Sequence, residues 1–243
     1  MAGDEATGGL RARPLYRGVR EELVRRIAEG VWQPGQALPS EFEIAADLGV
    51  SQGTVRKALD EMTAERLVVR RQGRGTYVAR HDDERILFQF FKLIPDSGGR
   101  RFPESRVLGV ETRPADAVAA ERLGIAAGEG IVAVERVRFV GGAAAIVERI
   151  TVAAALYPGL AERPLPNNLY ELYAAEFGVT IAAATERLKA VAAGSREAEH
   201  LGVAPGTPLL AIDRTARAID GRIAEWRVSL CRTDDLHYLC ELP

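Results

Sequence analysis

Residues 39–77 read PSEFEIAADLGVSQGTVRKALDEMTAERLVVRRQGRGTY, and this stretch decides the fold of the N-terminal third of the chain. Ser40 and Glu43 have the spacing of a capping box, which begins a helix. Gly49 permits the left-handed turn that ends it, and Ser51 caps a second helix. A short basic hairpin follows. This order predicts a winged helix-turn-helix, a module that places its second helix in the major groove of DNA.

The second helix of the motif has an apolar face and a polar face. The apolar residues recur at i, i+4 and i+7 and are expected in the core: Val55, Leu59 and Met62. The outer face then carries Gln52, Gly53, Arg56, Lys57 and Asp60. The amide of Gln52 can pair with adenine, the guanidinium of Arg56 suits guanine or phosphate, and Lys57 suits phosphate. We therefore expect this face to contact DNA.

The predicted wing has strands at 67–71 and 75–79, joined by a tip of Gln72, Gly73 and Arg74. Its glycines allow a close approach to DNA, and Arg71 and Arg74 supply positive charge. The alternative is a solvated charged face. Upstream, a helix is expected from Leu15 to about residue 29, with a buried stripe of Val19, Leu23, Ile27 and Val31.

The whole chain has 243 residues, a length that suggests two domains. Its net charge of −2 hides an asymmetry, because residues 11–80 carry 13 Lys and Arg against 9 Asp and Glu. No window approaches the roughly 18 apolar residues of a membrane span. Cys231 and Cys240 are the two cysteines, which indicates a reducing, cytoplasmic location. Residues 1–13 are expected to form a disordered tail.

An internal repeat with an offset of 78 residues organises the remainder. AERLGIAAG at 120–128 and AEHLGVAPG at 198–206 each lead into a strand, a turn and a returning strand. Between the copies we expect a helix at 168–177, capped by Asn168, and a long strand at 180–191. Two helix–hairpin units predict an α+β domain with an antiparallel sheet and packed helices.

Charged residues recur in the two predicted hairpins. Arg136 and Arg138 share one strand face, and Arg214 matches Arg136 at the repeat offset. Glu225 matches Glu148 with one residue fewer in the loop. If Asp220-Gly221 is a two-residue turn, the first loop, which has one residue more, contains an odd number of residues. An odd-numbered loop places Glu148 on the same face of the sheet as the two arginines. If these charges are buried, they need a partner, and a bound anion or polar metabolite would supply it. The alternative is that the charges pair with one another on a solvated face of the sheet.

Residues 14–80 closely resemble the DNA-binding domain of the GntR family of bacterial transcription regulators. The resemblance is carried by LY at 15–16, PGQALPSE at 34–41, LGVSQGTVRKAL at 48–59 and RRQGRGTYV at 70–78. It implies DNA contacts at Ser40, Ser51, Gly53, Thr54, Arg56, Gln72 and Gly73. Phe42 and Gln52 stand where relatives often have arginine, so we expect an uncommon operator. We also consider that Phe42 packs against the wing.

Residues from about 87 to 242 resemble the UTRA domain, the effector-binding partner of these modules in the HutC subfamily, which has a chorismate-lyase-like fold. The carriers include VERVRF at 134–139, NNLYELYAAEFGV at 167–179 and AEWRVSLCRTDD at 224–235. The resemblance implies effector ligands at Arg136, Arg138, Glu148, Asn168 and Glu225. Cys231 stands where many relatives have tyrosine and Asn168 where many have serine, so the effector is expected to differ from the amino-sugar phosphates of some relatives.

The expected organisation is a tail at 1–13, the winged module at 14–80, a linker and docking segment at 81–103, and the UTRA domain at 104–243, or from near 87. The function expected is a ligand-responsive repressor, a homodimer on pseudo-palindromic operator DNA, with a small polar or anionic effector, nucleoid-associated when bound. No cofactor and no metal are expected, because His81, His200 and His237 show no metal spacing. The alternatives are a lyase-type enzyme and a GntR regulator with a helical metal sensor.

Overall fold

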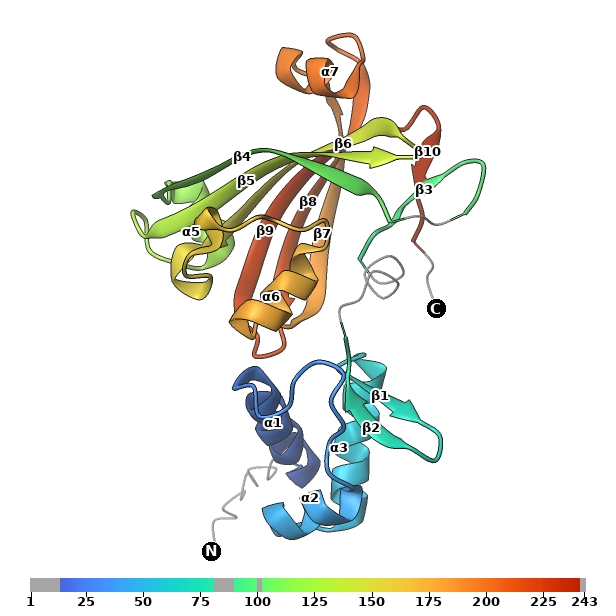
Figure 1. Cartoon of the computed structure of the whole chain (residues 1–243), viewed down its shortest axis with the longest axis vertical. Coiled ribbons are helices and arrows are strands. Elements are labelled where there is room, and N and C mark those ends of the chain that lie inside the picture. Colours follow the sequence, from blue (N-terminus) through green and yellow to red (C-terminus); the bar gives the residue numbers. More distant parts are fainter. Residues whose placement is uncertain (1–13, 81–89, 100–101, 241–243) are drawn as a thin grey trace, which may run out of the picture. The chain divides into compact units, whose positions relative to one another are not determined.

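The computed structural model describes residues 14–80, 90–99 and 102–240. The chain divides into two compact units, residues 1–79 and 80–243, which are described separately (Figure 1). The tail expected at 1–13 and much of the linker expected at 81–103 therefore lie outside the described residues.

The N-terminal unit has three helices and a two-stranded wing. Its elements are α1 (Leu15–Ala28), α2 (Glu41–Leu48), α3 (Gln52–Ala64), β1 (Val68–Arg71) and β2 (Gly75–Val78). The predicted core is confirmed for Val19, Leu23, Ile27, Val55, Leu59 and Met62, which are all buried. Val31 is 54% exposed, so its assignment to the buried stripe of α1 is wrong. The helix ends at Ala28, and Val31 lies beyond the helical repeat.

Local capping signals fix the helix-turn-helix. The Ser40 side chain accepts the N–H of Glu43, whose carboxylate accepts the N–H of Ser40, so the predicted capping box is present. Gly49 ends α2 with φ 64°, a left-handed conformation that favours glycine. The Ser51 hydroxyl accepts the N–H of Thr54 and begins α3. These contacts confirm the boundaries expected from the sequence.

The C-terminal unit is an antiparallel sheet with helices on both faces. The main strands are β4 (Glu104–Pro114), β5 (Gly130–Val140), β6 (Ala143–Ala153), β7 (Ile181–Ala192), β8 (Pro208–Ala218) and β9 (Ile223–Cys231), in the order β4-β5-β6-β9-β8-β7. The helices are α5 (Ala117–Leu123), α6 (Leu169–Phe177) and α7 (Ser195–Leu201), with 3-10 turns at Ala154–Leu156 and Leu160–Glu162. The two repeats thus place their hairpins side by side at the sheet centre.

The turns differ from those expected. Val140 pairs with Ala143 across the two-residue turn Gly141-Gly142, so the first loop is not odd-numbered. A β-bulge at Ala145 supplies the extra residue instead and puts Glu148 opposite Arg136, as predicted for the face they share. The second turn is longer than two residues, because the N–H of Ala218 donates to the carbonyl of Arg222.

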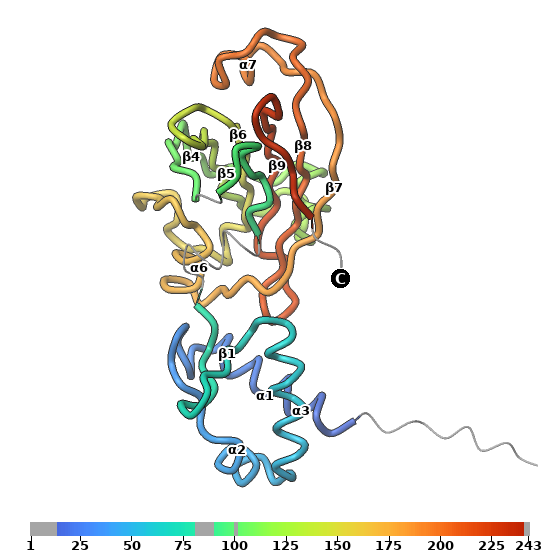
Figure 2. The backbone as a smooth tube through the Cα atoms, turned by 90° about the vertical axis from the view of Figure 1, so that its right-hand side faces the viewer, coloured from blue at the N-terminus to red at the C-terminus, as the bar shows by residue number. Residues whose placement is uncertain are grey.

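Each sheet face has its own cover. On one face α6 packs on alternate strand residues such as Val134 and Ile150, and this helix lies to one side of β8 and β9 in Figure 2. On the opposite face α5 contacts β9 and α7 contacts β6. A ribbon of β3 (Leu93–Pro95) and β10 (Leu236–Tyr238) covers the rest of the α6 face. Phe91 and Leu93 there pack on the sheet, which confirms the expected docking for the described part of 87–94.

Candidate functional site

The outer face of α3 is exposed as predicted. The exposed residues are Gln52, Gly53, Arg56, Lys57 and Asp60. The Ser51 and Thr54 hydroxyls lie 2.8 Å apart at the start of the helix. The face therefore presents an amide, a guanidinium and an ammonium group in one row, which is the donor set that reads base edges and phosphates.

Glu41 at the start of α2 organises this face, a role that the sequence reasoning missed. Its Oε2 accepts from Arg56 Nε at 2.9 Å and Arg56 Nη2 at 2.8 Å, and from Gln52 Nε2 at 3.4 Å. Its Oε1 accepts from Arg70 Nη2 at 3.5 Å. The hydrogen bond to Glu41 raises the pKa of Arg56. Gln52 and Arg56 are both expected to contact bases. Because one carboxylate binds both side chains, it fixes their positions in the absence of DNA.

Aromatic rings hold two other basic residues. Lys57 Nζ lies 4.2 Å from the centre of the Tyr16 ring. In the wing, the Arg71 guanidinium lies 4.6 Å from the Tyr77 ring centre, and the Tyr77 hydroxyl donates to the carbonyl of Arg74. These contacts leave the wing tip exposed and shaped by the positive φ of Gly73.

Phe42 does not pack against the wing, and that expectation is wrong. Its side chain on α2 is 73% exposed. The helix α2 packs on the core through Ile44 and Ala45, and Phe42 is not among its buried residues. Phe42 is therefore a solvent-exposed residue of α2.

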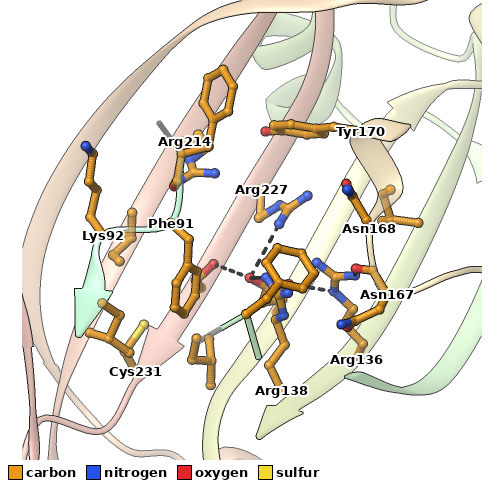
Figure 3. Close-up of a pocket in the computed structure, with 18 of the residues that line it drawn as sticks. Phe91, Lys92, Arg136, Arg138, Asn167, Asn168, Tyr170, Arg214, Arg227 and Cys231 are labelled. Atoms are coloured by element: carbon orange, nitrogen blue, oxygen red, sulfur yellow. Dashed lines mark hydrogen bonds and ion pairs between the residues drawn. The ribbon is translucent and has the colours of Figure 1, made fainter. Parts of the chain in front are cut away.

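The C-terminal unit contains a pocket on the α6 face of the sheet, between α6 and the β3–β10 ribbon (Figure 3). The space between its walls is about 560 Å³, and part of this space is open to solvent. Four of the five expected effector ligands line it: Arg136, Arg138, Glu148 and Asn168. Arg214, Arg227, Ser229 and Cys231 line it as well.

Glu148 lies at the pocket floor and accepts hydrogen bonds from three of its neighbours. Its carboxylate accepts from Arg136 Nε at 2.6 Å, from the Ser229 hydroxyl at 3.3 Å and from Arg227 Nη1 at 3.5 Å. Burial alone would raise its pKa, but the surrounding arginines, Arg136 foremost, hold the pKa of Glu148 well below its usual range. The group is therefore a fixed anion, and it is not suited to proton transfer near neutral pH.

Glu225 lies behind the pocket rather than on its wall. It is fully buried and accepts two bonds of 2.8 Å from Arg227, through Nε and Nη2. The hydroxyls of Tyr170 and Tyr173 on α6 donate to it at 3.2 and 3.1 Å. Glu225 thus orients Arg227 and ties α6 to the sheet. Arg227 was not predicted from the sequence, although its position two residues after Glu225 places both side chains on one strand face.

Arg214, Asn168 and Cys231 complete the wall. Arg214 Nε donates to Glu186 at 2.6 Å, and its Nη2 donates to the carbonyl of Phe90. Asn168 caps α6 by accepting the N–H of Glu171. Burial raises the pKa of the Cys231 thiol, which stays neutral and acts as a small apolar surface.

Within the described residues, no group of three or more His, Cys, Asp or Glu side chains could hold a metal ion. No helix in that part of the chain is long and apolar enough to cross a membrane.

Comparisons with known proteins agree with both units. The model of bacterial regulatory proteins of the gntR family matches residues 15–78, and the UTRA domain model matches residues 98–237. The chain is 30% identical to the HTH-type transcriptional repressor NagR of Bacillus subtilis, over 94% of this chain and 96% of that protein. It is 27% identical to the mannosyl-D-glycerate transport/metabolism system repressor MngR of Escherichia coli, over 93% and 95%.

A solved structure extends the likeness to the whole fold. The crystal structure of PhnF from Mycobacterium smegmatis is 28% identical, with a TM-score of 0.56, over 93% of this chain and 99% of that chain. The matched region includes the helix-turn-helix and the sheet that carries the pocket. The chain therefore belongs to the GntR family of bacterial transcription regulators, in the HutC-like group that carries a UTRA domain.

Proposed function

We propose that this regulator is a repressor whose pocket binds a small polar or anionic metabolite and whose affinity for operator DNA falls when that metabolite binds. The observation that supports this most is Arg138. Its side chain is 3% exposed, yet its Nε has no hydrogen-bond partner. Its Nη2 donates to the carbonyl of Pro103 at 3.2 Å, and its nearest carboxylate oxygen, on Glu148, is 3.9 Å away. A buried guanidinium with an unpaired N–H and so distant a counterion costs free energy, which an anionic ligand would offset.

The DNA contacts expected from the sequence belong to this proposal. They are Ser40, Ser51, Gln52, Gly53, Thr54, Arg56, Lys57, Arg71, Gln72, Gly73 and Arg74. A C2 homodimer would present two copies of α3 to a pseudo-palindromic operator. Effector binding would then act as a coupling free energy between two sites, typically 1–3 kcal/mol. A cytoplasmic location, on the nucleoid when bound, fits such a role.

The test uses full-length protein and a fluorescent operator selected from a random duplex pool. DNA affinity is measured by anisotropy with and without a broad panel of organic acids, sugar phosphates and neutral sugars. We expect at least one anionic compound to weaken DNA binding roughly 5- to 150-fold, the range of a coupling of 1–3 kcal/mol. Unchanged affinity across the whole panel would contradict the proposal. Chemical turnover of the active compound would favour the enzyme alternative.

A further inference from the structure

The pocket region buries more positive than negative charge. The arginines with nearly buried side chains are Arg136, Arg138, Arg214 and Arg227. The corresponding carboxylates are Glu148, Glu186 and Glu225. Among the residues that the structure describes, four cations against three anions leave one positive charge in excess, and Lys92 also lines the wall.

The uncompensated charge belongs to Arg138. Its nearest carboxylate oxygen is Glu148 Oε1, 3.9 Å from Nη1, and that carboxylate already serves Arg136 and Arg227. Burial lowers the pKa of Arg138 to about 9, which reflects the weakness of this compensation. One negative group beside Arg138 would restore the balance.

Several polar groups of the pocket are bonded to other residues of the protein. Ser229 and Glu148 are bonded to each other, and the Tyr170 hydroxyl donates to Glu225. Among the described residues that line the pocket, the buried side-chain atoms without a partner are Arg138 Nε and Asn167 Oδ1. A negative group beside Arg138 and a donor beside Asn167 Oδ1 would satisfy these two atoms.

An apolar part of the pocket wall begins beside Arg138, whose guanidinium carbon lies 5.4 Å from the centre of the Phe91 ring. Phe91, Leu93, Ile146, Ile212 and Cys231 form one buried cluster. All of these line the pocket, and Figure 3 shows Phe91 and Cys231 across the pocket from Asn167 and Asn168. This wall can bury the carbon skeleton of a ligand, and removing that apolar surface from water favours binding.

We infer that the effector is an amphipathic organic acid. Its carboxylate binds at Arg138, one hydrogen-bond donor meets Asn167 Oδ1, and an apolar or aromatic body packs on Phe91 and Cys231. This inference rests on the proposed function, which it narrows to an acid with an apolar or aromatic body.

The test measures binding to full-length protein by calorimetry. The acid probes are phenyllactate, 2-hydroxyisocaproate and 4-hydroxyphenylacetate, and each has its neutral amide as a matched control. Glucosamine 6-phosphate and inorganic phosphate form the opposing arm. We expect at least one acid to bind, with its amide at least 10-fold weaker. Binding of no acid, equal binding of acid and amide, or binding of glucosamine 6-phosphate alone would overturn the inference. Release of operator DNA by glucosamine 6-phosphate would still leave the proposed function standing.

Two variants test the assigned ends of the pocket on the acid that binds. Arg138→Gln should weaken binding at least 10-fold, whereas Arg149→Gln, an exposed arginine paired with Glu135 on the neighbouring strand, should change it less than 2-fold. Cys231→Tyr fills the apolar wall and should also weaken binding at least 10-fold. Urea denaturation checks that each variant folds. Full affinity in folded Arg138→Gln or Cys231→Tyr would contradict the placement.

Discussion

Replacing Glu225 by glutamine tests whether the pocket is held rigid by its buried ion pair. The substitution keeps the volume and removes the charge that accepts two bonds from Arg227 and two from the tyrosines of α6. The new amide can accept through one atom only, so at least one donor loses its partner. Arg227 would keep at most one of its two bonds to this side chain, besides the 3.5 Å contact with Glu148.

The expected loss of stability is large because the site excludes water. Glu225 is 0% exposed, and removing one partner of a buried pair costs about 3–5 kcal/mol. Domains are stable by about 5–15 kcal/mol, so the C-terminal unit loses a large part of its margin. With a urea m-value of about 2 kcal/mol/M, the midpoint should fall by about 1.5–2.5 M.

Tryptophan fluorescence can report the C-terminal unit alone. The chain has two tryptophans, Trp32 and Trp226, and a Trp32→Phe background leaves Trp226 on β9 next to the altered residue. Glu135→Gln is the matched control, because its pairs with Arg149 and Arg196 lie on the surface and are each worth less than about 1 kcal/mol. A midpoint for Glu225→Gln within 0.5 M of this control would refute the reasoning.

Three further outcomes follow from the same contacts. Because the folded pKa of Glu148 lies below its unfolded value of about 4.3, its stabilisation is present above that pH and is lost as the pH falls through the folded value. The stability gap between wild type and Glu148→Gln should therefore narrow in urea titrations from pH 6 to pH 3, and a constant gap would contradict this. Glu41→Gln should release Arg56 and lower the free-energy preference for specific over non-specific DNA by up to about 1–3 kcal/mol, measured by competition anisotropy. An unchanged preference would show that Arg56 does not depend on Glu41 for its position. Arg74→Ala should weaken operator binding and reduce the salt slope of log K by about 1, and an identical slope would place the wing tip away from phosphate.

The N-terminal unit was predictable because its signals are local. Ser40, Glu43, Gly49 and Ser51 each act within four residues, so spacing alone located the helices. The role of Glu41 was not predictable in this way. It contacts Arg56 and Arg70, which are 15 and 29 residues away, and only the packing of α2 against α3 and the wing brings them together.

The pocket shows a similar division. The repeat located both hairpins, and strand alternation paired Arg136 with Glu148. The bulge at Ala145 that makes the pairing possible has no sequence signal of its own, since the Gly-Gly turn accounts for the glycines. Glu225 was predicted as a ligand from motif position, yet only the structure shows Arg227 between it and the pocket.

The arrangement of polar and apolar residues along β5 argues that the charged cluster is kept for recognition rather than for folding. Val132 and Val134 face α6 and form its core, and the next two residues on that face are Arg136 and Arg138. Strand alternation would be satisfied equally by valine at both positions, and replacing buried ion pairs by apolar residues is often neutral or stabilising. The two arginines of β5 lie where the cover of this sheet face changes from α6 to the β3–β10 ribbon. Glu225 and the α6 tyrosines then hold Arg227 in place, which lowers the entropy that a ligand must overcome to order it.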